Sequence, residues 1–200
     1  ELFEDARGKK VYTNEGQTRA INKMKRWWTA AKDQANELGI SVTGRTNMGP
    51  GSLRTNFLQA LQDANRIFVL AGRGGTGKTT IVDRAITELE IDPTKVRFAL
   101  PTHKAKQVIM EATHQYEDEQ FSTISSLLGQ LPQWQRDPVT GRLVERFVQD
   151  RDRYEDSMET LAETELIVID EASMVNEYFT AQLIEAANAK NIRLLFMGDN

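Results

Sequence analysis

The chain contains four short apolar runs, at residues 67–70, 96–100, 166–169 and 192–197. Each run is continuous rather than alternating, which is typical of strands covered on both faces in a parallel sheet. Segments whose apolar residues recur with helical periodicity lie between them, at 77–89, 103–116 and 175–190. This alternation of strand and helix predicts an α/β fold with an open parallel sheet and right-handed crossovers.

The N-terminal third has a different pattern. A long helix is predicted from Glu15 to Leu38, with Asn14 as its capping residue. The stretch that follows, 41–52, is rich in Gly, Pro, Ser and Thr and predicts a loop, and a short amphipathic segment then leads to the first strand. We therefore divide the chain into an N-terminal helical segment, 1–65, with an insertion near 40–64, and an α/β domain, 66–200.

Composition and charge narrow the possible functions. The chain has 200 residues, with 25 Lys and Arg, 29 Asp and Glu, two His and no Cys, which excludes disulfides, thiolate zinc sites and multi-histidine metal centres. No apolar run approaches a membrane span and no signal peptide opens the chain, so we expect a cytoplasmic protein (host-cell cytoplasm for a phage protein) without a membrane partner. The net charge is +7 over residues 1–110 and −11 over 111–200, which fits either a half facing a polyanion or an uneven scatter of solvated charge.

The strongest motif is Gly-Arg-Gly-Gly-Thr-Gly-Lys-Thr at 72–79, a full match to the phosphate-loop pattern between a predicted strand and helix. Backbone N–H groups of such a loop point at phosphate oxygens, and the helix N-terminus adds partial positive charge. The other interpretation is a glycine-rich turn without a ligand. The predicted ATP-binding residues here are Gly72, Gly74, Gly75, Thr76, Gly77, Lys78, Thr79 and Thr80.

A second motif follows the apolar run 166–169, which ends in Asp170 and Glu171. A carboxylate at the end of a buried strand beside a phosphate loop can hold Mg²⁺, so Thr79 and Asp170 are the predicted metal residues. Lys78 is expected to reach the β- and γ-phosphates and Glu171 to orient the attacking water, which makes these two the predicted catalytic residues. Taken alone, an apolar run that ends in Asp-Glu also fits an ordinary strand end. The predicted cofactors are ATP and Mg²⁺.

Several segments in order resemble the first RecA-like domain of superfamily 1 DNA helicases, in the branch of RecD and the phage Dda helicase. They are 72–79, Leu-Pro-Thr-His-Lys-Ala-Lys at 100–106, Ser-Thr-Ile-Ser-Ser-Leu-Leu at 122–128, Ile-Asp-Glu-Ala-Ser-Met at 169–174, and Gly198-Asp199. They are similar to family motifs I, Ia, Ib, II and the start of III. The resemblance covers residues 11–35 and 66–200. It implies a RecA-like P-loop domain and ATP-driven 5′ to 3′ movement on single-stranded DNA, with unwinding at duplex junctions, in DNA replication or repair.

The resemblance also assigns individual residues. Gln17, in Thr-Asn-Glu-Gly-Gln at 13–17, resembles the glutamine that reads the adenine edge. The alternative is that Asn14 and Gln17 form an N-cap with its partner three residues on. Ser125 stands where the family has His. The alternative for Lys104 is an ordinary solvent-exposed charge on the helix surface. The residues implied to contact single-stranded DNA are Pro101, Thr102, His103, Lys104, Thr123 and Ser125.

Between residues 131 and 159 the alternation of strand and helix is interrupted, and we place an insertion at 131–156. Asp-Pro-Val-Thr-Gly at 137–141 predicts a turn, so we expect a β-hairpin insertion here. The insertion coincides with the place of the hairpin pin that splits the duplex in this branch, and Trp134 or Phe147 would be the aromatic that stacks on the last base pair. The alternative is burial of both rings against the domain. The adjacent Trp27 and Trp28 are predicted to pack the N-terminal helix.

The two ends suggest a piece of a longer protein, because the chain starts at Glu1 without Met and stops at Asn200 directly after a strongly apolar run. In the family ATP lies between two RecA-like domains, so with the second domain missing we expect the isolated chain to be nearly inactive. Two other functions stay open. They are a P-loop ATPase or kinase that does not separate strands, and a non-catalytic nucleic-acid-binding module, against which the intact Lys78, Thr79, Asp170 and Glu171 speak.

Overall fold

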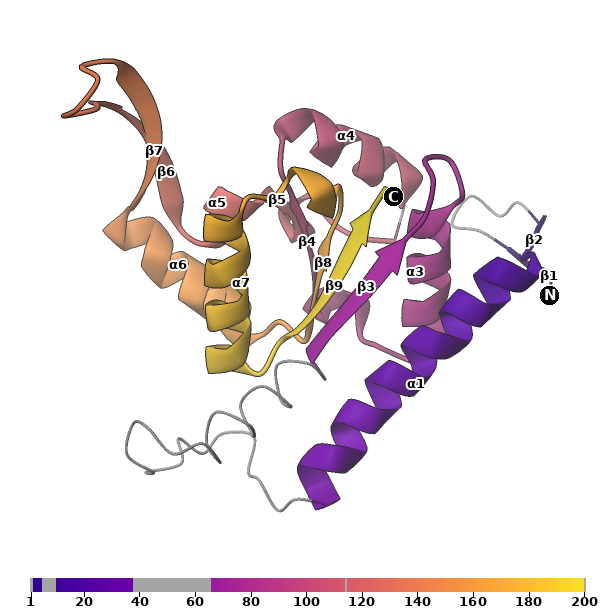
Figure 1. Cartoon of the computed structure of the whole chain (residues 1–200). Coiled ribbons are helices and arrows are strands. Elements are labelled where there is room, and N and C mark those ends of the chain that lie inside the picture. Colours follow the sequence, from indigo (N-terminus) through magenta and orange to yellow (C-terminus); the bar gives the residue numbers. More distant parts are fainter. Residues whose placement is uncertain (1, 5–9, 38–65, 114, 200) are drawn as a thin grey trace.

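The computed structural model describes residues 2–4, 10–37, 66–113 and 115–199. At its centre is a five-stranded parallel sheet (Figure 1). In order across the sheet, the strands are β3 (Ile67–Ala71), β9 (Arg193–Gly198), β8 (Leu166–Ile169), β4 (Val96–Leu100) and β5 (Phe121–Thr123). The open parallel sheet confirms the α/β fold that the four apolar runs predicted. The predicted insertion near 40–64 lies outside the described residues.

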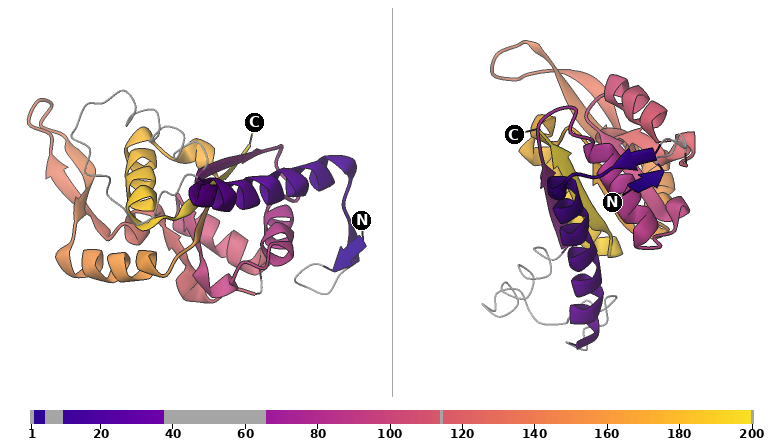
Figure 2. Two further views of the ribbon diagram at one scale, coloured as in Figure 1. Left: turned by 90° about the horizontal axis from the view of Figure 1, so that it is seen from below. Right: turned by 90° about the vertical axis from the view of Figure 1, so that its right-hand side faces the viewer.

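Helices cover both faces of the sheet (Figures 1 and 2). Successive residues of a strand point to opposite faces, and in β8 Leu166 and Val168 join one apolar core while Ile167 and Ile169 join the other. One face packs against α1 (Glu15–Glu37), α3 (Lys78–Glu88) and α4 (His103–Ala112); the other packs against α5 (Ile124–Leu127), α6 (Arg151–Ala162) and α7 (Glu177–Lys190). None of the helices in the described part of the chain is long and apolar enough to cross a membrane.

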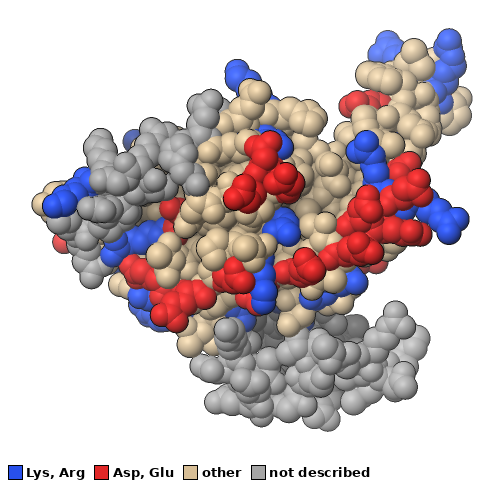
Figure 3. Space-filling model, turned by 180° about the vertical axis from the view of Figure 1, so that it is seen from behind, with Lys and Arg blue, Asp and Glu red and all other residues tan. Residues whose placement is uncertain are grey.

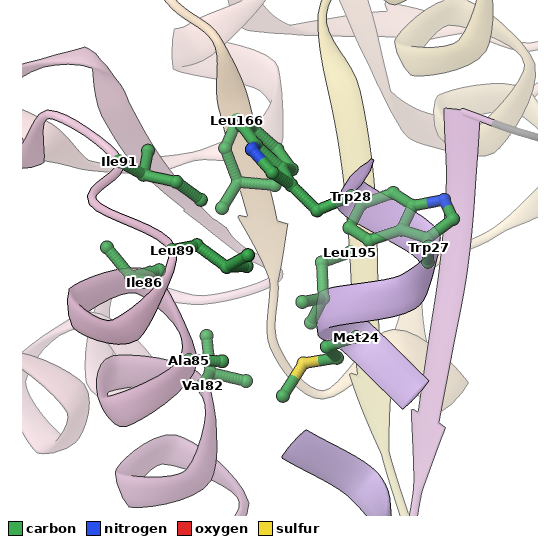
Figure 4. A pocket seen from close by; sticks show the side chains of 10 residues that line it. All are labelled: Met24, Trp27, Trp28, Val82, Ala85, Ile86, Leu89, Ile91, Leu166 and Leu195. Carbon is green, nitrogen blue, oxygen red and sulfur yellow. The ribbon is translucent and has the colours of Figure 1, made fainter. Parts of the chain in front are cut away.

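Trp27 and Trp28 pack α1 against the sheet, as predicted. Trp28 is buried, and the guanidinium of Arg193 lies over its ring, with 4.0 Å from Cζ to the ring centroid. Arg193 Nη1 also donates to the Trp28 carbonyl at 2.9 Å. The Trp27 ring contacts Phe68, with the centroids 5.4 Å apart. Figure 4 shows both rings beside an apolar cavity of about 10 Å³ between α1, α3 and the sheet, which is too small for an organic ligand.

Two features of the α4 region differ from the prediction. The helix ends at Ala112 rather than 116, since Tyr116 instead packs edge-on against Phe98 in the core, with the centroids 4.8 Å apart. The edge strand β5 was not predicted. The smaller elements among the described residues are an antiparallel pair, β1 (Leu2–Glu4) and β2 (Lys10–Tyr12), and three single 3₁₀ turns, η1 (Pro93–Lys95), η2 (Asp118–Gln120) and η3 (Ala172–Met174).

An antiparallel hairpin of β6 (Gln130–Arg136) and β7 (Leu143–Gln149) projects from the domain (Figure 1). Its turn forms as predicted, because Asp137 Oδ1 accepts the N–H groups of Val139 and Thr140 at 3.0 and 2.7 Å. The predicted boundaries, 131–156, are too long at their C-terminal side. Residues 151–156 belong to α6, which begins where the Asp150 side chain accepts the N–H of Arg153.

Candidate functional site

Each predicted motif follows the end of a different strand at one edge of the sheet. Along this edge lie the phosphate loop after β3, Asp199 after β9, Asp170 after β8, Thr102 after β4 and Thr123 at the end of β5. In open parallel sheets, ligands bind outside the carboxyl ends of the strands. The fold therefore brings the predicted nucleotide residues together on β3, β9 and β8 and the predicted DNA residues together on β4 and β5.

The phosphate loop has the strand–turn–helix setting that its motif requires. Gly75 and Gly77 have φ of +74° and +76°, in the left-handed region that glycine adopts without strain. The Gly72 N–H donates to the Gly198 carbonyl at 3.2 Å, which ties the start of the loop to β9. A Cβ added to Gly74 would lie 3.3 Å from Asp199 Oδ2, so Gly74 lets the loop and Asp199 approach closely.

Lys78 opens α3, and its side chain is largely buried. Its ammonium donates to the Gly72 and Arg73 carbonyls at 2.9 and 3.2 Å and forms an ion pair with Asp199 Oδ1 at 2.5 Å. An ammonium has three protons, so these partners use all of its donors. A phosphate that binds Lys78 has to replace at least one of these three partners. Asp199 is the partner that a phosphate most resembles, because both are anions.

Asp170 lies beside this lysine at the end of β8. Burial raises the pKa of the Asp170 carboxyl above its ordinary value, although the N–H of Glu171 and the charge of Lys78 act in the opposite direction. Asp199 raises this pKa as well. The next residue, Glu171, is exposed and has φ of +50° and ψ of +42°, a left-handed conformation that is strained for a residue with a side chain. Strain of this kind concentrates at functional sites.

The donor set fits Mg²⁺. The Thr79 hydroxyl and the Asp170 carboxylate supply oxygen, the ligand that Mg²⁺ prefers, and Mg²⁺ is usually held by one or two protein oxygens together with substrate phosphates and water. In the described part of the chain no group of three or more His, Cys, Asp and Glu could hold a metal. The described residues are thus suited to a Mg²⁺ site that protein oxygens and nucleotide phosphates form together, rather than to a site formed by protein ligands alone.

Gln17 links α1 to the phosphate loop. Its backbone N–H donates to Asn14 Oδ1 at 2.9 Å and its Oε1 accepts the Asn14 N–H at 3.0 Å, which is the capping arrangement that one interpretation of the sequence predicted. Its Nε2 also donates to the Thr76 carbonyl at 3.0 Å, a contact that the sequence did not predict. The amide keeps one N–H and one oxygen lone pair beyond these bonds, so adenine contact stays a prediction.

The predicted DNA residues lie at the ends of two neighbouring strands. Thr102 Oγ1 accepts the Ala105 N–H and Thr123 Oγ1 accepts the Ser126 N–H, both at 3.2 Å, so each threonine caps the helix that follows it. A hydroxyl that accepts in this way keeps its own proton to donate. Thr123 Oγ1 lies 3.2 Å from Ser125 Oγ. Pro101 is half-buried, and the other three residues of the first group, Thr102, His103 and Lys104, are exposed.

The two hairpin aromatics lie in different environments. Trp134 is 68% exposed, whereas Phe147 is half-buried and meets Phe179 of α7 edge-on, with the ring centroids 5.0 Å apart. The alternative in which both rings are buried against the domain is therefore wrong for Trp134, whose side chain is largely exposed to solvent. The sequence did not predict that Phe179 contacts the hairpin, because its spacing fits an ordinary core position of α7.

Residues 54–200 match the family described as an AAA domain. The uncharacterized protein R530 of Acanthamoeba polyphaga mimivirus is 27% identical over 149 residues, which cover 69% of this chain and 29% of that protein. The structure of Bacteroides Pif1 bound to ssDNA is similar with a TM-score of 0.43 and 24% identity, over 74% of this chain and 32% of that one. Pif1 helicase of Candida albicans gives a TM-score of 0.44 and 21% identity, over 76% and 33%.

The chain thus spans less than a third of the viral relative and about a third of each Pif1 chain. The family match covers the phosphate loop, both carboxylates after β8 and the whole parallel sheet. Together with the loop geometry, it implies nucleotide binding at the carboxyl edge. The chain belongs to the AAA domain family, and its fold is that of a RecA-like P-loop domain carrying a small antiparallel hairpin.

Proposed function

We propose that the chain is the N-terminal motor domain of an ATP-dependent DNA helicase of superfamily 1, in the RecD and Dda-like branch, which moves 5′ to 3′ on single-stranded DNA. The observation that carries the proposal is the order of the motifs along one sheet edge, with nucleotide and DNA residues on adjoining strands. The Asp170 N–H donates to the Ala99 carbonyl at 3.2 Å, so the backbone of this predicted metal residue is bonded directly to the strand that leads to Thr102. A movement of Asp170 when nucleotide binds would therefore act directly on the strand that carries the predicted DNA residues.

On the nucleotide side, the loop N–H groups and Lys78 would bind the ATP phosphates, with Lys78 exchanging Asp199 for a phosphate oxygen. Thr79 and Asp170 would hold Mg²⁺, which when bound neutralises charge on the phosphate oxygens. Glu171, with its exposed carboxylate next to Asp170, would accept a proton from the attacking water and orient it. Gln17 would use its remaining N–H and lone pair on the adenine edge.

On the DNA side, the exposed first turn of α4 offers the Thr102 hydroxyl, His103 and Lys104 at a helix N-terminus. Hydroxyls, cations and helix N-termini contact phosphates and do not read bases, which suits a motor that moves along any sequence. Figure 3 shows acidic side chains in a band across the back of the molecule as Figure 1 presents it. Such a face repels nucleic acid. The exposed acidic residues of α6 are Asp152, Glu155, Asp156 and Glu159.

The hairpin would separate the strands at a duplex junction. Trp134 presents an exposed indole on one face of the hairpin, and Arg136, on the same face two residues farther out, is also exposed. An aromatic ring can stack on the last base pair, and an arginine can contact the phosphates beside it. The hairpin turn at 137–141 lies beyond both residues, so it would meet the duplex first.

The experiment that tests the function is ATP hydrolysis by the full-length protein with and without single-stranded DNA, together with unwinding of a duplex that has a 5′ single-stranded tail. We expect hydrolysis that DNA stimulates and unwinding that needs the 5′ tail. Hydrolysis that DNA does not change would instead support a P-loop ATPase or kinase without strand separation. No hydrolysis would support a binding module. The 200-residue chain on its own is expected to hydrolyse ATP at only a trace rate, because its described residues form one RecA-like domain and the proposed motor binds ATP between two.

A further inference from the structure

Both strands of the hairpin contact the same face of α7. On β7, the Phe147 ring meets the Phe179 ring at 5.0 Å with an interplanar angle of 67°. On β6, Gln130 Nε2 donates to Gln182 Oε1 at 2.5 Å. Phe179 and Gln182 are three residues apart, so they lie on one face of the helix. We infer that Phe179, with Gln182 beside it, is the positioning residue that fixes the direction of the hairpin relative to the nucleotide site.

A second support holds the base of the hairpin from another side. Gly129 has φ of +68°, and a Cβ added there would lie 2.7 Å from Tyr154 Cα, so no other residue fits. Gln149 Nε2 donates to the carbonyls of Leu128 and Gly129 at 2.9 and 3.0 Å, and the Asp150 N–H donates to the Gly129 carbonyl at 3.1 Å. These bonds fix where the hairpin leaves the domain. The contacts with α7 then decide in which direction it points.

The position of Phe179 also connects the hairpin to the nucleotide site. Phe179 lies eight residues after Glu171, and its N–H donates to the Asn176 Oδ1 that caps α7, at 2.9 Å. Between them, the Met174 N–H donates to the Glu171 carbonyl at 2.9 Å and closes η3. The residues that hold the hairpin therefore follow the carboxylates of the nucleotide site along one continuous, hydrogen-bonded segment. Under the proposed function, on which this role rests, Phe179 keeps Trp134 aimed at the junction.

The chain contains no cysteine, so spin labels can be attached at chosen positions without altering native residues. Val139, 91% exposed at the hairpin tip, and Lys190, exposed at the end of α7, suit a Val139→Cys and Lys190→Cys pair in this chain. Pulsed electron spin resonance then gives the distribution of tip-to-helix distances. We expect one narrow distribution for the parent. Phe179→Ala should reduce the ratio of docked to undocked hairpins by about tenfold and broaden the distribution.

Matched variants separate positioning from general packing. Phe179→Tyr keeps the ring and should keep the distribution narrow. Leu143→Ala removes an apolar side chain of the outer hairpin that is 59% exposed and takes no part in the contacts with α7 described above, and it should also leave the distribution narrow. Phe147→Ala should broaden it as Phe179→Ala does, and the double variant should add little, since both changes break one contact. Gln182→Ala, which deletes the other contact, should broaden it less. Thermal unfolding of each variant verifies that the domain is folded.

In the full-length protein, Phe179→Ala should lower the unwinding rate about tenfold while ATP hydrolysis with single-stranded DNA stays within about twofold of the parent. A narrow, unshifted distance distribution in folded Phe179→Ala would overturn the inference, as would equal broadening in Leu143→Ala. The label distances do not depend on any activity. If the protein unwinds no DNA but the distances respond as expected, the proposed function fails and the positioning role of Phe179 stands.

Discussion

Lys78 Nζ and Asp199 Oδ1 lie 2.5 Å apart, so the cation of the phosphate loop is paired with the carboxylate that follows β9. The pair joins two residues 121 positions apart in the chain. Lys78 is mostly shielded from solvent, whereas the Asp199 side chain is 61% exposed, and solvent screens its share of the attraction. Phosphate and Asp199 compete for one ammonium, and this competition can be measured.

Asp199→Asn should raise the affinity for Mg-ATP by about two- to fivefold, because the phosphate no longer displaces an anion from Lys78. Calorimetric titration of the purified chain measures this. Asp152→Asn on α6, another exposed aspartate, removes the same charge far from the loop and should leave the affinity unchanged. Weaker binding by Asp199→Asn would show that Asp199 takes part in holding the nucleotide.

Lys78→Ala should reduce ATP hydrolysis by the full-length protein at least about 10²-fold, because it removes the cation that meets the charge developing on the phosphates. Arg73→Ala is the control within the same loop, since the Arg73 side chain is exposed, and it should hydrolyse ATP far faster than Lys78→Ala. Steady-state turnover at saturating ATP is the measurement. Near-normal turnover by Lys78→Ala would remove the phosphate-loop assignment.

Glu171→Gln should behave differently from Lys78→Ala. Gln keeps the size and hydrogen bonding of the side chain but cannot accept a proton from water, so binding of Mg-ATP should persist while hydrolysis falls about 10²- to 10⁴-fold. Equilibrium binding and single-turnover hydrolysis separate the two effects. Failure of this variant to bind nucleotide at all would give Glu171 a structural role, one in keeping with its left-handed backbone.

Asp170→Asn should stabilise the fold at neutral pH. Since burial raises the pKa of Asp170, the folded state favours the protonated carboxyl and is penalised once pH rises above the unfolded pKa, about 3.9. Asn resembles the protonated form and avoids this penalty. Urea unfolding should therefore show a higher free energy of unfolding for the variant at pH 7, and the difference should disappear below about pH 3, where Asp170 is protonated in both states. A variant less stable than the parent at pH 7 would contradict the direction of the shift.

Trp134→Ala should lower duplex unwinding more than DNA-stimulated ATP hydrolysis, because a wedge acts only at the junction. The ring is 68% exposed, so the free energy of unfolding should change by no more than about 0.5 kcal/mol. Leu143→Ala is the control on the same face of the hairpin, at a residue that is 59% exposed, and it should leave unwinding close to normal. Unwinding and hydrolysis that decline together in Trp134→Ala would argue against a wedge.

Much of the fold follows from local pattern. The strands β3, β4, β8 and β9 were predictable because parallel strands buried on both faces leave continuous apolar runs. The phosphate loop was predictable because its glycines and Lys78 have a fixed spacing that the chemistry demands. The strand β5 was not, since it has three residues and two of them, Ser122 and Thr123, are polar. Its partner β4 decides its structure, and a contact between distant segments leaves no periodic signal.

The same reason explains what sequence reasoning missed in the site. The Gln17 amide caps α1 and also contacts the Thr76 carbonyl, 59 residues away, and the capping pattern alone does not reveal the second bond. Phe147 and Phe179 each look like ordinary apolar residues of a strand and a helix. Their contact depends on where the hairpin leaves the domain. That point is fixed at Gly129, whose close approach to Tyr154 is a tertiary feature.

The crowded base at Gly129 has a consequence for how the hairpin can change in length. Because the constraints lie at Gly129, Gln130, Phe147 and Gln149, the outer rungs from Gln133–Arg146 to Arg136–Leu143 carry none of the anchoring bonds described above. Adding two residues to each strand beyond these anchors preserves which side chains lie on each face, whereas adding one exchanges the faces. The hairpin could therefore grow or shrink in steps of two residues per strand, about 7 Å each, over an unaltered α/β domain.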